Sequence, residues 1–439
     1  GLERSRGLER SRGLERSRGL ERSRGLERSR ELERSRELER GRGLERSRGQ
    51  SIPELDRRDL ELIEATQRRS FRYFWEKGHP RTGLARERLS RPHVTTTGGS
   101  GFGVMAIIIA VERGFIARSE ARMRLCKILA ALERSNRYHG AWPHWLDGRN
   151  DETIPFSSMD DGGDLVETAL LIQGLLCARQ YFSRNSIEEE WIRDKVNELW
   201  REVDWQHYSR GGSQLYWHWS PKHRWSMNLP IKGWNEALIA YVLATASPSH
   251  PVSPRLYHDV WAKGEDFRNR RKYYGYELPL GPDYGGPLFF CHYSFLGLDP
   301  RGLRDRYADY WLQNRNHTLI NRAHCIENPQ GYKEYGANCW GLTSSDSPKG
   351  YAAHCPLNDL GVISPTAALS SMVYTPAHSL QALQFFHDYR KGSLFGEFGF
   401  KDAFETSGEW IASDYLAIDQ GPIIVMLENF RTGLLWKLF

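Results

Sequence analysis

The chain has 439 residues, enough for one large domain or two ordinary ones, and a formal net charge of +6. All of that charge lies in residues 1–48, which hold 16 Arg and 10 Glu, so the other 45 basic and 45 acidic residues balance. A neutral remainder gives no electrostatic reason to expect a nucleic-acid partner. No apolar run reaches ~18 residues, so we expect no membrane span, and no apolar signal segment is visible at the start.

Residues 1–48 form eight hexads, six of which read Gly-Leu-Glu-Arg-Ser-Arg. A six-residue step turns an α-helix by about 600°, so successive leucines point in three directions and make no stripe. The repeat therefore does not predict a coiled coil. We expect residues 1–50 to form a disordered low-complexity tail that arose by repeat expansion. No polar linker follows, so residues 51–439 are predicted to form one domain.

Helical periodicity starts after Ile52 and recurs to the end of the chain, with Gly, Pro and aromatic residues between the repeats. It predicts helices at 54–77, 102–114, 118–135, 164–183, 187–204, 234–246, 255–264, 301–325, 365–373, 376–390 and 420–437. Short strand-like patches are expected at 140–146 and 214–219. About a dozen helices with long aromatic loops favour an all-α fold, an (α/α)6 toroid or barrel with short β patches in its loops.

Aromatic side chains are abundant, with 15 Trp and 12% Phe, Trp and Tyr in total. Many of the Trp residues lie in predicted loops close to acids. Aromatic rings cover the C–H faces of sugars while acids and amides bind hydroxyls, so this composition indicates a saccharide site, although about half of the rings should belong to the core. The side chains expected to contact substrate are Trp142, His144, Trp145, Trp217, Trp234 and Trp340.

Glycoside cleavage needs two carboxyl groups in different surroundings, one protonated for the leaving oxygen and one ionised to activate water or attack. In the run Asp160-Asp161-Gly162-Gly163-Asp164-Leu165-Val166-Glu167, three aspartates precede a long apolar helix. The free N–H groups and the dipole at a helix N-terminus keep carboxylates ionised. Plain helix capping would explain one Asp and one Glu. It leaves two acids unexplained, so we assign a functional role to the cluster.

The second candidate is Glu236, in the run Gly233-Trp234-Asn235-Glu236-Ala237-Leu238-Ile239. The periodicity places this residue in the first turn of an apolar helix beside Trp234. An apolar wall raises the pKa of a carboxyl group and favours its protonated form, which suits a general acid. The plainer alternative is an exposed glutamate that stabilises the helix dipole.

Signals for other chemistry are weak. The Cys–His neighbours lack zinc-ligand spacing, and the six scattered cysteines need no disulfide framework, although one or two bridges could form in an oxidising compartment. The run 101–106 matches a dinucleotide fingerprint, but no convincing strand precedes it, so close helix packing is the better interpretation. We expect no metal and no cofactor.

At these residues the sequence resembles the bacterial glycoamylase-like domain, and within it the endo-β-1,2-glucanases of glycoside hydrolase family 144. The resemblance runs from about Leu60 to Phe439. Besides the two acidic runs, the motifs that carry it are Gly101-Phe102-Gly103, Glu112-Arg113-Gly114, Trp142-Pro143-His144-Trp145, Asn328-Pro329, Ser370-Ser371-Met372, and the runs 173–176, 340–346, 398–404 and 416–422. The hexad tail has no counterpart in that family.

The resemblance implies an (α/α)6 barrel that hydrolyses β-1,2-glucan to short sophoro-oligosaccharides by endo cleavage with inversion. The family's essential acids correspond to Asp160, Asp164, Glu167 and Glu236. The contrast in their surroundings favours Glu236 as proton donor and an aspartate of the 160–164 pair as the group that orients water.

Two further acids, Asp346 and Asp419, each lie in a matching motif and are expected to bind substrate. The resemblance also implies a periplasmic or extracellular location, while free cysteines are unusual there. We expect a monomer whose partner is a β-glucan oligosaccharide or polysaccharide.

Two alternatives stay open at the level of the sequence. The same fold could carry an exo-acting sophorohydrolase, a transglycosylase or a lyase, and a lyase would need a Tyr or His base in place of paired acids. The chain could also be a non-catalytic glycan-binding protein, for which Glu236→Gln would leave binding intact.

Overall fold

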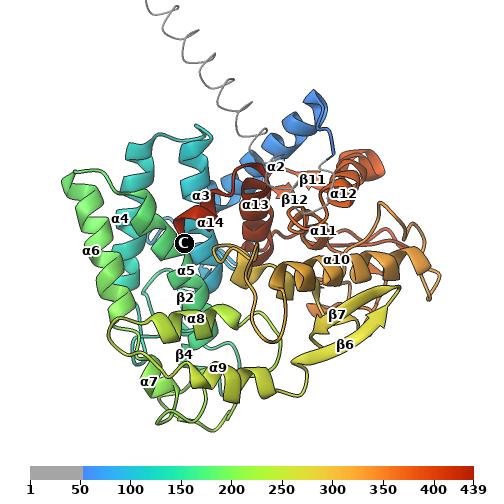
Figure 1. Cartoon of the computed structure of the whole chain (residues 1–439). Helices are drawn as coiled ribbons and strands as arrows, with labels where there is room; N and C mark the ends of the chain where they lie inside the picture. Colours follow the sequence, from blue (N-terminus) through green and yellow to red (C-terminus); the bar gives the residue numbers. More distant parts are fainter. Residues whose placement is uncertain (1–52) are drawn as a thin grey trace, which may run out of the picture. The chain divides into compact units, whose positions relative to one another are not determined.

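The computed structural model describes residues 53–439 (Figure 1). The hexad tail lies outside the described residues, so the prediction made for it stays a prediction. Glu54–Asn429 and Gly433–Phe439 together form one compact unit, and the elements below belong to it.

Helices dominate the described residues (Figure 1). The α-helices are α2 (Arg57–Lys77), α3 (Thr97–Glu112), α4 (Arg118–Arg134), α5 (Leu165–Tyr181), α6 (Ile187–Arg201), α7 (Trp205–Tyr208), α8 (Leu238–Ala246), α9 (Arg255–Asp259), α10 (Tyr310–Glu327), α11 (Pro365–Leu369), α12 (Pro376–Asp388), α13 (Ala417–Arg431) and α14 (Leu434–Leu438). Short 3-10 turns are η1 (Trp261–Lys263), η2 (Asp283–Gly285), η3 (Leu288–Cys291), η4 (Tyr293–Phe295) and η5 (Tyr389–Gly392). The fold is therefore helix-rich, as the periodicity predicts.

The strands of the described residues are short and pair antiparallel in small sheets. They are β1 (Val94–Thr96) with β2 (Trp145–Asp147) and β3 (Thr153–Ile154), β4 (Gly163–Asp164) with β5 (His218–Trp219), β6 (Arg268–Tyr273) with β7 (Tyr276–Leu280), β8 (Ser344–Ser345) with β9 (Ala352–Ala353), β10 (Val362–Ile363) with β13 (Phe404–Glu405), and β11 (Phe395–Gly396) with β12 (Gly399–Phe400). The hairpin β6–β7 was not predicted, because its Arg- and Lys-rich first strand shows no apolar alternation. Its turn, Tyr274–Gly275, has positive φ at both residues, as a tight hairpin requires.

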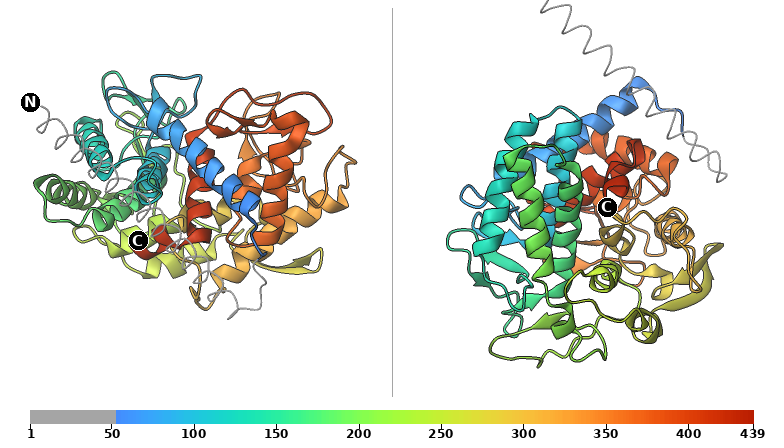
Figure 2. Two further views of the ribbon diagram at one scale, coloured as in Figure 1. Left: turned by 90° about the horizontal axis from the view of Figure 1, so that it is seen from above. Right: turned by 60° about the vertical axis from the view of Figure 1, so that its left-hand side comes forward.

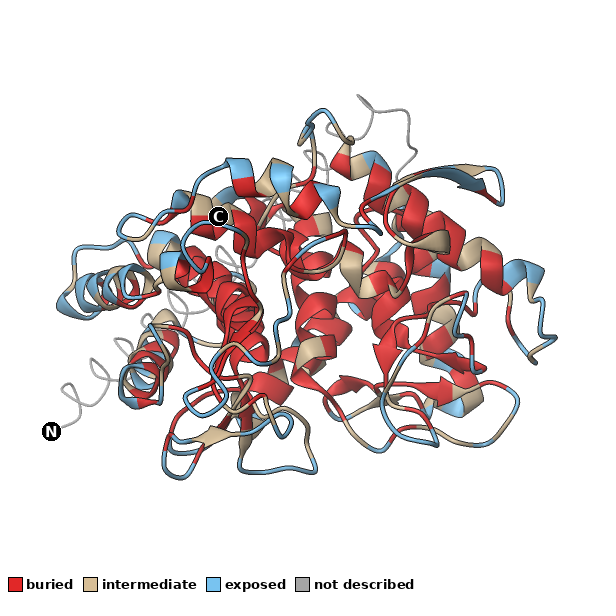
Figure 3. Ribbon diagram, turned by 90° about the horizontal axis from the view of Figure 1, so that it is seen from below, coloured by how far each residue is buried: buried red, intermediate tan, exposed pale blue. Residues whose placement is uncertain are grey.

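Helices α3 and α5 pack directly against each other, and both are buried along most of their length (Figure 3). Glycines permit this close approach: a Cβ on Gly101 would lie 2.5 Å from the Leu170 carbonyl oxygen, and one on Gly174 would lie 2.2 Å from the Gly101 carbonyl oxygen. Helices α4 and α6 pack together outside this pair (Figure 2). The structure thus confirms helix packing, and not nucleotide binding, as the role of the glycines near residue 101.

Several predicted helix bounds are wrong. The helix expected at 102–114 starts at Thr97, and those expected at 255–264 and 365–373 end at Asp259 and Leu369. The helix expected at 234–246 starts at Leu238, because the Asn235 side chain accepts a hydrogen bond from the Ala237 N–H (2.9 Å) and turns the chain first. The helix expected at 301–325 starts at Tyr310. The helix expected at 420–437 is two helices, α13 and α14, separated by Gly433 with φ of 67°. Glu236 consequently lies in a turn before α8 and not in its first helical turn.

Two features bear on the environment of the protein. No helix within residues 53–439 is both long and apolar enough to cross a bilayer. All six cysteines lie in that part of the chain as free thiols, so the bridges considered from the sequence do not form in this structure. Burial raises the pKa of the Cys177 and Cys291 thiols, which keeps them protonated and unreactive.

Candidate active site

Asp164 caps the N-terminus of α5. Its Oδ1 accepts hydrogen bonds from the N–H groups of Val166 (3.0 Å) and Glu167 (2.9 Å), and its Oδ2 lies 3.0 Å from Nδ1 of His144. Antiparallel pairing with His218 in β5 fixes the backbone on the other side. Both carboxylate oxygens of Asp164 are therefore held in place by neighbouring groups.

Glu167 turns away from its own helix end and reaches the N-terminus of α3. Its Oε2 accepts a hydrogen bond from the Gly98 N–H (2.6 Å), and its Oε1 lies 3.9 Å from Nε2 of His144. A Cβ on residue 98 would lie 2.6 Å from the same Oε2, so glycine is needed there. The capping interpretation is thus right for Asp164, but Glu167 makes no reciprocal capping bond. A helix N-terminus is a favourable place for its carboxylate.

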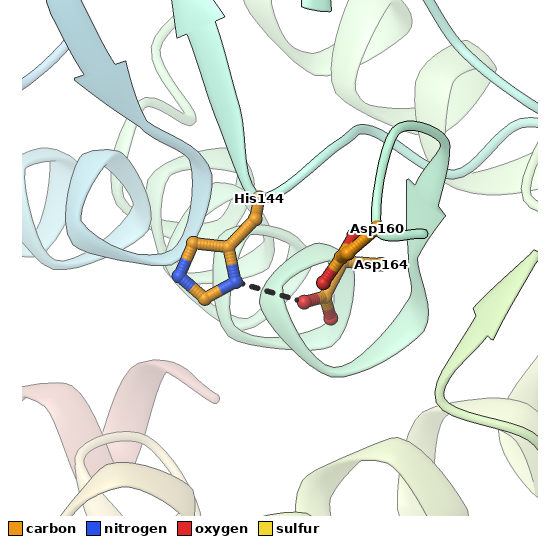
Figure 4. A group of neighbouring side chains, drawn as sticks. All are labelled: His144, Asp160 and Asp164. Carbon is orange, nitrogen blue, oxygen red and sulfur yellow. Dashed lines mark hydrogen bonds and ion pairs between the residues drawn. The ribbon is translucent and has the colours of Figure 1, made fainter. Parts of the chain in front are cut away.

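His144 lies between these two carboxylates, and Figure 4 shows its hydrogen bond to Asp164. Although burial lowers the pKa of its imidazole, the negative charges of Glu167 and Asp164 outweigh burial and raise that pKa to about 9. The ring is consequently a cation at neutral pH. It supplies the positive charge that the two buried carboxylates require.

Asp160 lies beside Asp164 in the same turn (Figure 4), and its Oδ1 is 3.1 Å from Nε2 of His218. Among the described residues, His144, Asp160 and Asp164 form the one group whose donor atoms, all within 4.8 Å of one another, could surround a metal ion. The imidazolium already provides a cation there. Asp161, by contrast, accepts a hydrogen bond from the Ser220 hydroxyl.

The carboxyl of Glu236 has a pKa near neutrality. Burial, with smaller contributions from the charges of Asp164 and Glu167, raises the pKa of its carboxyl from 4.5 to about 7. Burial also raises the pKa of Glu167, and the His144 cation and the Gly98 N–H offset that shift only in part. Asp164 has different surroundings, since two backbone N–H groups and the His144 ring hold its carboxylate. Two carboxyls in different surroundings are what glycoside cleavage needs.

The tryptophans predicted to contact substrate divide into two groups. Trp142 and Trp340 are 0% exposed and Trp234 is 2% exposed. These three rings are enclosed by the core in this structure, which argues against contact with substrate, and that contact stays a prediction for them. Trp145 and Trp217 are only partly buried, so the prediction stays open for them.

Asp346 and Asp419 belong to a second acidic group. Both oxygens of Asp346 accept hydrogen bonds from Arg88 Nη1 (3.1 and 3.0 Å), and its N–H donates to Asp402 Oδ2 (2.7 Å). The carboxyls of Asp402 and Asp419 are hydrogen-bonded to each other. Burial and the charge of Asp402 raise the pKa of Asp419 well above its usual value. Burial and the charge of Asp346 raise the pKa of Asp402 to about 6. The pair therefore shares a proton, and Asp346 is occupied by its ion pair with Arg88.

Five residues in or beside the two acidic groups were not identified as site candidates from the sequence. Gly98 lies in a glycine-rich run, His218 in the predicted strand patch 214–219, and Asp402 in a motif shared with the family. None of these patterns indicates which distant side chain the residue contacts. Tyr293 gave no signal: burial raises the pKa of its hydroxyl, and the charges of Asp419, Glu236 and Glu167 raise it further, so it lies near both acidic groups. Phe156, whose ring is 4.1 Å from that of His144, gave none either.

Two family models match separate parts of the chain. The Glycoamylase family model, described as "Putative glucoamylase", matches residues 228–439, and a model for a protein of unknown function, DUF3131, matches residues 65–160. The chain is 43% identical over 404 residues to the exo β-1,2-glucooligosaccharide sophorohydrolase of Parabacteroides distasonis. That match covers 87% of this chain but only 56% of the sophorohydrolase, so the chain spans little more than half of that protein.

Solved structures of β-1,2-glucanases are also similar to this chain. The endo-β-1,2-glucanase of Chitinophaga pinensis, in a complex with sophorotriose and glucose, is 51% identical with a TM-score of 0.85, and the match covers 87% of this chain and 94% of that one. The β-1,2-glucanase of Parabacteroides distasonis is 43% identical with a TM-score of 0.85, over 87% of this chain and 58% of that one. With half of its residues identical across nearly all of the Chitinophaga enzyme, the chain belongs to the glycoamylase-like proteins of glycoside hydrolase family 144.

Proposed function

We propose that the chain is a glycoside hydrolase that cleaves β-1,2-glucan internally, with inversion, to sophoro-oligosaccharides. The observation that carries this proposal is the contrast between Glu236, whose carboxyl has a pKa of about 7, and the Asp164 carboxylate, which is held by two backbone N–H groups and the His144 ring. The similarity to the Chitinophaga glucanase supports the substrate class.

In this mechanism Glu236 gives its proton to the glycosidic oxygen as the bond to the anomeric carbon breaks. Water attacks that carbon from the opposite face and passes a proton to a carboxylate. Asp160 suits this role, because its carboxylate lies beside that of Asp164 and its Oδ1 is 3.1 Å from Nε2 of His218, which would orient the carboxylate. Asp164 and Glu167, held by backbone N–H groups, would fix the geometry around it. Inversion needs roughly 6.5–9.5 Å between the two carboxyl groups.

Endo action is favoured over exo action by the identities: the chain is 51% identical to the endo-acting relative and 43% identical to the exo-acting sophorohydrolase.

The (α/α)6 toroid is part of the same proposal. It is supported by the inner pair α3–α5 with α4 and α6 packed outside it, and by the TM-score of 0.85 to the Chitinophaga enzyme. We also propose that residues 51–439 act as one domain and a monomer in the periplasm or outside the cell, which sedimentation and cell fractionation would test.

The test is incubation of the full chain with linear β-1,2-glucan, with products separated by chromatography, beside a Glu236→Gln variant. A ladder of short sophoro-oligosaccharides that the variant does not form supports endo hydrolysis and the role of Glu236. Sophorose as the single early product would support the exo-acting alternative. Binding of the glucan without cleavage by either protein would favour a glycan-binding protein.

A further inference from the structure

Phe156 is a large apolar side chain left in solvent beside the acidic group at the α5 N-terminus. It is 49% exposed and lies in the exposed run 155–158 between β3 and β4. An isolated exposed aromatic ring needs no explanation by itself. The contacts of Phe156 are what make it informative.

The Phe156 ring contacts two aromatic neighbours. Its centroid lies 4.1 Å from that of His144, with 32° between the planes, and 4.9 Å from that of Trp145. The backbone N–H of Phe156 donates to the Asp160 carbonyl (2.8 Å), and the Asp160 N–H donates to the Ser157 carbonyl (3.2 Å). These contacts place the ring beside His144, whose imidazole is hydrogen-bonded to Asp164.

About half of the surface of Phe156, 49%, is open to solvent. The imidazolium of His144 on one side is attracted by the negative face of the ring, which holds the ring against it. The equatorial hydroxyls of a β-linked glucose leave both faces of the sugar lined by C–H groups. A flat aromatic surface beside carboxylates and an imidazolium is suited to such a ring, and an ordered ring loses little entropy on binding.

We propose that Phe156, supported by His144 and Trp145, is the stacking platform of a glucosyl-binding subsite that adjoins the acidic group. This inference rests on the proposed function. It adds a residue that defines where one sugar unit of the substrate sits relative to Asp160 and Asp164.

The test compares Phe156→Leu, Phe156→Ala and Phe156→Trp in the full chain, with Trp191→Ala as a control. Leu keeps apolar cover over His144 but removes the flat surface, whereas Trp keeps the surface. Trp191 in α6 is a 37% exposed aromatic residue outside the site. The measurements are kcat and KM on sophoro-oligosaccharides of defined length, and binding of the same sugars by calorimetry.

We expect the Leu and Ala variants to raise KM and weaken binding by on the order of tenfold, with kcat changed less than about threefold, and the Trp variant to stay within about twofold of wild type. Unchanged KM and binding in the Leu variant would overturn the inference. So would a fall in kcat alone, which would mean that Phe156 only shields the His144 ion pairs. If the wild type binds these sugars without cleaving them, the proposed function fails while the calorimetry still decides on Phe156.

Discussion

Burial of Glu236 should set the upper pH limit of activity. Its carboxyl has a pKa of about 7 in place of 4.5. At pH 7 about half of the molecules then carry the proton that the leaving oxygen needs, against roughly 0.3% for an unshifted carboxyl. The surroundings of Glu236 therefore increase the population of competent acid about 150-fold at neutral pH.

The assay is the release of reducing ends from β-1,2-glucan between pH 5 and 9, analysed as kcat/KM, which reports groups of the free enzyme. Above pH 7 we expect kcat/KM to fall about tenfold per pH unit. Glu236→Gln should lose about 10²–10⁴-fold in rate and lose this alkaline limb. A wild-type profile that stays flat to pH 9, or a limb that survives in the Gln variant, would show that Glu236 is not the proton donor.

The same shift predicts an effect on stability. Because the pKa of Glu236 is raised on folding, the native state binds more protons than the unfolded chain between pH 4.5 and 7. The contribution of this group to the free energy of unfolding therefore falls as pH rises through that window. Glu236→Gln should raise Tm relative to wild type at pH 8 and leave it unchanged at pH 4.

Other substitutions test the remaining contacts. His144→Gln removes the cation 3.9 Å from Glu167, so the carboxylate should protonate more readily and kcat/KM at pH 5 should fall about tenfold relative to its value at pH 7. Gly98→Ala puts a Cβ 2.6 Å from Glu167 Oε2 and should lower kcat about tenfold or more with a small change in Tm. Arg118→Met removes the cation that forms two hydrogen bonds (2.7 and 2.9 Å) to Glu189, which is 0% exposed, and should cost about 3–5 kcal/mol of stability in denaturant unfolding, with kcat unchanged.

Matched controls separate these effects from general damage. Gly336→Ala adds a methyl group where no atom lies within 4 Å, so kcat and Tm should stay at wild-type values. If Gly98→Ala also leaves kcat and Tm at wild-type values, activity does not depend on the present position of the Glu167 carboxylate. A pH profile of His144→Gln that is scaled down but not changed in shape would mean that His144 contributes packing and not charge.

The parts of the site that the sequence predicted are those fixed by local chemistry. An aspartate before an apolar helix predicts a cap, and Asp164 caps α5. A glutamate in an apolar run predicts a raised pKa, and Glu236 has one, although the Asn235 turn moves the helix start to Leu238.

The parts that could not be predicted depend on segments distant in the chain. Whether a loop tryptophan is core or surface depends on what packs over it, and Trp142 and Trp340 are fully enclosed. The partner of Glu167 is a backbone N–H 69 residues away at Gly98, and no local pattern encodes such a pairing. Phe156 carries no signal in the sequence because its importance comes from lying against His144.

The two-residue pairing of β4 with β5 has a consequence for refolding. It joins Asp164 to His218, and Glu167 must also find Gly98 across 69 residues, so the active arrangement depends on contacts between distant parts of the chain. Helices form from local contacts and form early, whereas long-range pairings form slowly because loops must close first. On dilution from denaturant, far-ultraviolet circular dichroism should therefore recover before enzymatic activity does.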